Sequence, residues 1–131
     1  MSIRLKISRG LAYAIGVLAP LGDTIRRWDT WREFPPALLD DYLIGALLLS
    51  GAWATRDGRS PRGRALLAAG WGFACAMCYC SACLHWLAMR AGQPDPAPIP
   101  TEWVFAIKVL ATSLAFVALT LTLADTPSSG R

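Results

Sequence analysis

The sequence is short of charged residues and of the residues on which most catalysis and metal binding depend. Of its 131 residues, 17% are charged, against about 25% in ordinary soluble domains. It holds a single histidine, His85, which excludes a haem held by two histidines of one monomer. A Walker loop, a dinucleotide-binding glycine pattern and a His-Glu-x-x-His zinc site are all missing. We therefore expect neither an enzyme nor a bound cofactor.

Apolar residues, by contrast, make up 54% of the chain and gather in long runs. Within residues 65–89 only His85 can carry a charge, and within residues 103–124 only Lys108 does so. About 20 apolar residues cross the roughly 30 Å hydrocarbon core of a bilayer as a helix. Neither run has the polar face that a surface helix of a soluble protein shows. Both runs are therefore predicted to span a membrane.

Two further spans and one surface helix are predicted from weaker patterns. A span over 37–55 starts after two prolines, and a span over 9–26 requires Arg9 and Arg26 to reach the headgroups. Residues 24–34 alternate aromatic and charged side chains, which is typical of a helix on the membrane surface. We predict an all-α integral membrane bundle of four transmembrane helices, with a short interfacial amphipathic helix between the first and second. The single domain 1–131 has spans at 9–26, 37–55, 65–89 and 103–124, an interfacial helix at 24–34 and a proline-rich outer loop at 91–102.

The basic residues predict a direction for these helices. The short loop 56–64 holds four arginines, and short basic loops stay in the cytoplasm. We expect both termini to be cytoplasmic in a multi-pass protein of a bacterial inner membrane, with an uncleaved first span. The lipid bilayer is the expected partner, together with a second copy or a larger membrane complex. The net charge of +4 is attributed to lipid headgroups and not to nucleic acid.

Four cysteines are clustered in the third span, at positions 75, 78, 80 and 83. At about 100° per residue they point in different directions from one helix, so they do not converge on one ion. A second grouping, Cys75, Cys78, His85 and Met89, shares one face and offers soft ligands suited to copper or haem iron. The main interpretation remains helix packing, since cysteine acts as a small hydrophobe and small residues let membrane helices approach. Gly70, Ala74, Cys78 and Ala82 recur at such a spacing, as do Ala68, Gly72, Ala76 and Cys80.

A second candidate site is ionic. Lys108 lies inside the fourth predicted span, and Asp40 and Asp41 lie in the first turns of the second. Ionisable groups within membrane helices are costly and usually face a partner or a cavity. We expect Lys108 to form an intramembrane ion pair with Asp40 or Asp41. The alternatives are that Lys108 extends to the outer headgroups, or that the three residues serve transport or a proton relay.

These patterns leave three classes of function. The first is a structural or accessory membrane protein that acts through helix–helix contacts, which the small size and short loops favour. The second is a metal- or haem-handling protein using Cys75, Cys78, His85 and Met89. The third is a small transporter or ion carrier using Asp40, Asp41 and Lys108.

Overall fold

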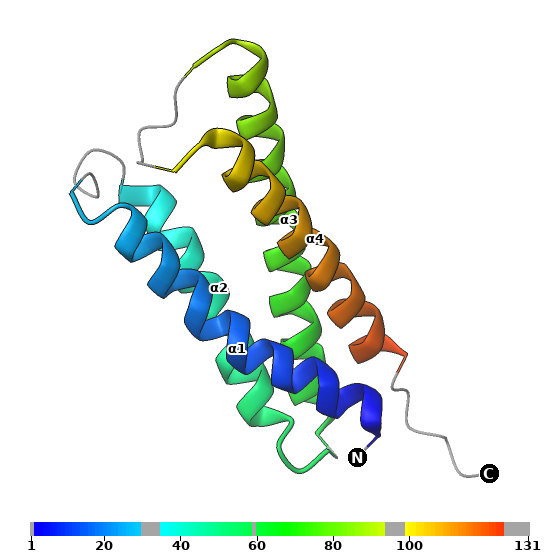
Figure 1. The fold of residues 1–131 in the computed structure, drawn as a ribbon. Coiled ribbons are helices and arrows are strands. Elements are labelled where there is room, and N and C mark those ends of the chain that lie inside the picture. The colour runs from blue at the N-terminus through cyan, green and yellow to red at the C-terminus, as the bar shows by residue number, and fades with distance from the viewer. Residues whose placement is uncertain (1, 30–34, 59, 94–98, 125–131) are drawn as a thin grey trace.

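The computed structural model describes residues 2–29, 35–58, 60–93 and 99–124, with the backbone alone for 35–38. These residues form helices α1 (Ile3–Arg26), α2 (Pro35–Ala54), α3 (Pro61–Arg90) and α4 (Thr101–Leu123). The helices run up and down as a bundle (Figure 1). We call the end that holds the start of α1 and the end of α4 the terminal end, and the opposite end the far end. The predicted all-α four-helix architecture is confirmed.

Two of the helices begin at a serine whose side chain accepts a hydrogen bond from a backbone N–H of the first helical turn. Ser2 Oγ accepts a hydrogen bond from the backbone N of Leu5 at 3.2 Å, and Ser60 Oγ accepts one from Gly63 at 3.0 Å. Serine is among the residues that best cap a helix start, and proline is favoured directly after it, as Pro61 is in α3. Because of its cap, α1 starts at Ile3, ahead of the span predicted from residue 9.

The connection between α1 and α2 differs from the predicted interfacial helix over 24–34. Residues 24–26 form the last turn of α1 and residues 27–29 form a turn, while 30–34 lie outside the described residues. In the predicted proline-rich loop 91–102, residues 101 and 102 already belong to α4. Residues 94–98 of that loop, and the C-terminal tail from 125, also lie outside the described part of the chain.

The helices pack in the order α1–α2–α3–α4, and α4 closes the ring against α1 through the least extensive of the four contacts. The α1–α2 and α2–α3 contacts are close because glycines remove side chains from these two interfaces. A Cβ on Gly45 of α2 would lie 2.6 Å from the Gly16 carbonyl oxygen of α1. A Cβ on Gly51 of α2 would lie 2.6 Å from the Leu67 Cα of α3. The backbones of α1–α2 and α2–α3 therefore approach where glycine permits it.

At the terminal end, a buried hydrogen-bond network joins α1, α3 and α4. The Trp71 indole N–H donates to Ser8 Oγ at 2.9 Å, and the Ser8 and Thr122 hydroxyl oxygens lie 2.7 Å apart. Both hydroxyls also lie within hydrogen-bond distance of the Ala118 carbonyl, at 3.2 and 2.8 Å. Leu5, Leu67 and Ala115 belong to the buried core around it. Burying these polar groups is tolerated because each has a partner.

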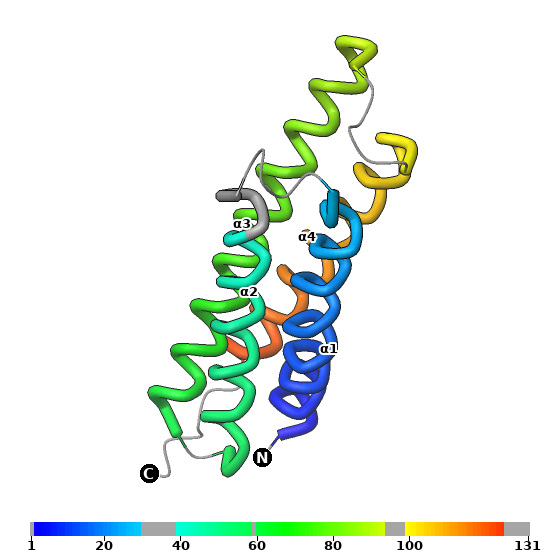
Figure 2. Tube along the Cα trace, turned by 90° about the vertical axis from the view of Figure 1, so that its left-hand side faces the viewer, coloured from blue at the N-terminus to red at the C-terminus, as the bar shows by residue number. Residues whose placement is uncertain are grey.

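Two of the helices, α3 and α4, are long and apolar enough to cross a membrane by length and composition. The core helix of a soluble protein would be mostly buried, but only 17% of the most apolar stretch of α4 is buried inside the protein. Figure 2 shows α3 continuing past α1 and α2 at the far end. Exposed Trp53 lies beside the α2–α3 connection, and exposed Trp28, Trp86 and Trp103 lie near the far end.

Candidate functional site

A cavity of about 460 Å³ lies between α1 and α4, with α2 and α3 behind it. It exists because α1 and α4 meet at the terminal end, through Ser8 and Thr122, and diverge toward the far end (Figure 1). Its volume is within the range of about 300–1,000 Å³ that is usual for small-molecule sites. The lining is formed by Ile15, Leu18, Ala19, Gly22, Asp23, Arg26, Asp41, Ile44, Ala74, Cys78, Ile99, Val104, Ile107, Lys108, Leu110, Ala111, Leu114 and Ala115.

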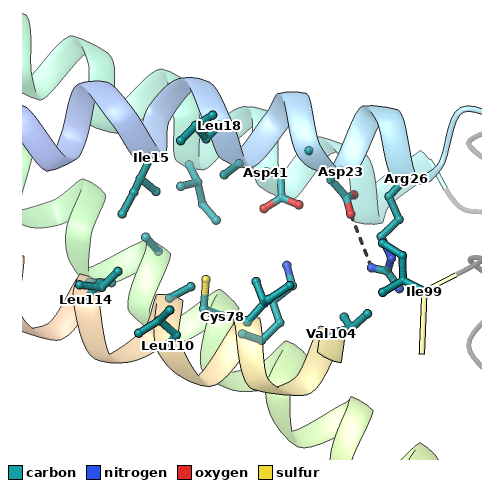
Figure 3. Close-up of a pocket in the computed structure, with 18 residues that line it drawn as sticks. Ile15, Leu18, Asp23, Arg26, Asp41, Cys78, Ile99, Val104, Leu110 and Leu114 are labelled. Carbon is teal, nitrogen blue, oxygen red and sulfur yellow. Dashed lines mark ion pairs between the residues drawn. The ribbon is translucent and has the colours of Figure 1, made fainter. Parts of the chain in front are cut away.

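The lining divides into an apolar part and a charged part. Figure 3 shows Ile15, Leu18 and Leu114 toward one end of the cavity and Asp23 and Arg26 toward the other, beside Ile99 and Val104. The α1 residues that line it recur at helical spacing, so one face of α1 supplies the wall. Such a site, mostly apolar with a few convergent polar groups, suits a ligand that is itself amphipathic.

Asp23, at the charged end, is buried and held by two arginines of its own chain segment. Its carboxylate lies 3.7 Å from Arg26 Nη1 and 3.0 Å from Arg27 Nε. These arginines follow Asp23 by three and four residues, the spacing at which side chains of a helix meet. The Asp23 charge is therefore compensated by Arg26 at the end of α1 and by Arg27, which directly follows it, and the remaining charged side chains of the lining are Asp41 and Lys108.

The structure distinguishes Asp41 from Asp40. Asp41 is 8% exposed and its carboxylate points into the cavity (Figure 3), whereas Asp40 is half-buried and does not contribute to the lining. Lys108 of α4 lines the same cavity. No ion pair within 4.0 Å joins Lys108 to either aspartate in the described structure. Of the three predicted groups, Asp41 and Lys108 thus line the same cavity without an ion pair, and Asp40 does not line it.

The predicted face of Cys75, Cys78, His85 and Met89 is divided among different surroundings. Cys75 Sγ lies 3.9 Å from the Thr112 carbonyl oxygen of α4, and Cys78 lines the cavity opposite Asp41. His85 Nδ1 lies 2.7 Å from the Ser81 carbonyl oxygen of its own helix. Across the ranges that the structure describes, no three His, Cys, Asp or Glu side chains are grouped as a metal would require.

The two small-residue stripes of α3 also have different surroundings. The first stripe faces the bundle: Gly70, Ala74 and Ala82 are buried, and Cys78 is half-buried. In the second stripe Ala76 and Cys80 are exposed. The first stripe therefore packs against neighbouring helices, as expected for small residues, whereas the second leaves a shallow outer face.

Sequence reasoning missed the cavity and the part that Asp23 plays in it. Asp23 is buried inside α1 beside two arginines, although it is not among the residues that the sequence singled out. The available signal was the spacing from Asp23 to Arg26 and Arg27, which predicts ion pairs on one helical face. No protein-family model, curated protein or solved structure matches this chain.

Proposed function

We propose that this chain is an integral membrane protein of four spans, with α1 and α2 crossing the bilayer beside α3 and α4. Large apolar side chains are exposed on α1 and α2 as well, among them Val17, Leu21 and Leu43. Both helices pack directly against the apolar pair, so a bilayer around α3 and α4 also surrounds them. The exposed tryptophans at both ends of the bundle suit the two headgroup regions.

The proposed orientation places the terminal end and the α2–α3 loop in the cytoplasm of a bacterial cell. It is tested with single cysteines in a background whose four native cysteines are replaced. Gln93→Cys in the α3–α4 connection should react with a membrane-impermeant thiol reagent in intact cells. Ser60→Cys in the α2–α3 loop should react only after permeabilisation. Equal labelling of both in intact cells contradicts the orientation.

The proposed role of this membrane protein is to bind an amphipathic molecule in the cavity between α1 and α4. The observation that carries this role is the division of the cavity into a long apolar wall and a charged end. A molecule with an apolar chain reaches such a site from the bilayer, and its head group meets Asp41 and Lys108. Binding is proposed because the lining is mainly apolar and its polar side chains are few.

The binding role is tested by filling the cavity. Ala111 lines it from α4, whereas Ala106 of the same helix is exposed and does not. Protein purified in mild detergent should carry a small amphipathic molecule that mass spectrometry identifies. Ala111→Trp should lose this molecule, and the matched control Ala106→Trp should keep it. Equal retention by both variants, each folded by circular dichroism, contradicts the proposal.

A structural or accessory role through helix contacts is the second candidate. The observation in its favour is the outer face of α3, where Ala76 and Cys80 are exposed. Small exposed residues allow a further membrane helix to approach closely. Ala76→Leu should then reduce the mass of the complex isolated from membranes, while Ala106→Leu should leave it unchanged. A transport role would use the same cavity and is distinguished by flux into proteoliposomes.

A further inference from the structure

The charges around the cavity indicate what kind of head group it accepts. Four side chains with a formal charge line it: Asp23, Arg26, Asp41 and Lys108. Two are acidic and two are basic, so the formal charges of these four side chains cancel. A head group with a net charge would be attracted by the two side chains of opposite sign and repelled by the two of the same sign. This balance favours a head group that is neutral overall.

The arrangement of the charges adds a second constraint. Asp23 is engaged with Arg26 and Arg27, but no ion pair within 4.0 Å joins Asp41 to Lys108 in the described structure. Isolated charges beside apolar walls are costly. A ligand that carries one positive and one negative group can pair with both side chains at once.

We infer that the cavity binds a zwitterionic amphiphile with a single chain, with its ammonium group at Asp41 and its phosphate at Lys108. The inference rests on the proposed binding role and specifies the ligand for the same site. The chain lies along Ile15, Leu18 and Leu114, away from the charged end. A volume of about 460 Å³ suits one chain and a compact head group. Each charge-assisted hydrogen bond adds to affinity and to selection between head groups.

The test compares three probes with the same 16-carbon acyl chain and different head groups. Lysophosphatidylethanolamine is zwitterionic, lysophosphatidylglycerol is anionic, and monoacylglycerol is uncharged. Dissociation constants are measured by native mass spectrometry on the purified full chain. The wild-type protein should bind the zwitterionic probe about tenfold more tightly than either other probe, the effect of one hydrogen bond to a charged group.

Two substitutions assign this preference to particular residues. Lys108→Gln and Asp41→Asn should each remove the preference, because each removes the side-chain charge that pairs with one charge of the head group. Asp40→Asn is the matched control, because Asp40 neighbours Asp41 but does not line the cavity, and it should keep the preference. The thermal unfolding midpoint of each variant in detergent shows that it is folded.

The outcomes separate this inference from the binding role on which it rests. Equal binding of all three probes, or tighter binding of the anionic probe, overturns the zwitterionic inference and leaves the binding role standing. Failure of the wild-type protein to bind any probe overturns both. A preference for the zwitterionic probe that survives both Lys108→Gln and Asp41→Asn overturns the assignment to these residues.

Discussion

The two ends of the bundle differ in how α1 and α4 are packed. At the terminal end, α1 and α4 are joined by buried Ser8, Thr122 and Trp71, whose polar atoms are paired. Toward the far end the same helices separate around a cavity lined by Asp41 and Lys108. We infer that the packing at the terminal end stabilises the bundle, whereas the far end contains the candidate site. Substitutions at the terminal end should therefore change stability more than matched substitutions on exposed surfaces.

The largest effect is expected at Trp71, which is fully buried and donates a hydrogen bond. Trp71→Ala should lower the free energy of unfolding by about 3–5 kcal/mol, because it leaves a large void and removes the hydrogen bond to Ser8. Trp53→Ala is the control, since Trp53 is 62% exposed. Unfolding in mixed detergent micelles, followed by circular dichroism, measures both. Similar losses for the two variants would remove the contrast between core and surface.

A smaller effect is expected where glycine brings α2 against α3. A Cβ at Gly51 would meet the Leu67 backbone, which cannot move aside as a flexible side chain can. Gly51→Ala should therefore cost about 1–3 kcal/mol of stability through overpacking. Gly72 has nothing within 4 Å of an added Cβ, so Gly72→Ala should stabilise α3 by about 0.5–1 kcal/mol. The same micelle assay checks the opposite signs, and two changes of the same sign would contradict this packing.

The smallest effect is expected from a single hydroxyl of the terminal network. Thr122→Val keeps the shape of the side chain but removes its hydroxyl from Ser8 and Ala118, which should cost about 1 kcal/mol. Thr120 is exposed, and its hydroxyl bonds only to the Val117 carbonyl of its own helix. Thr120→Val should therefore change stability by less than about 0.5 kcal/mol. A larger loss for Thr120→Val would show that the network does not hold the terminal end.

Sequence patterns predicted the four helices because the relevant signals are local. Apolar runs, the two prolines at the start of α2 and the serine–proline start of α3 each act over a few residues. The start of α1 was missed because the span was delimited by charge, and charged Arg4 and Lys6 are compatible with a helix that extends past an apolar core. A helix can therefore be longer than its apolar segment that would lie in a bilayer.

The sequence predicted some residues of the candidate site but not their arrangement. The sequence singled out Asp40, Asp41 and Lys108 together, but neighbouring residues on a helix point about 100° apart. Which aspartate faces α4 depends on how α2 is rotated in the bundle, and the close approach at Gly45 and Gly51 contributes to that rotation. The cavity depends further on the divergence of α1 and α4, which no local pattern encodes. Distances between helices that are far apart in the chain require the assembled structure.

The length of α3 has a consequence for the membrane that would surround the bundle. Its 30 residues make a rod about 45 Å long, against about 30 Å of hydrocarbon in a typical bilayer. In such a bilayer α3 must either tilt or raise its far end, with Trp86 packed on Phe105, beyond the hydrocarbon. Each ångström of mismatch costs a fraction of a kcal/mol. The thickness of the bilayer would then affect the tilt of α3 and α4, and a thicker bilayer would reduce this tilt.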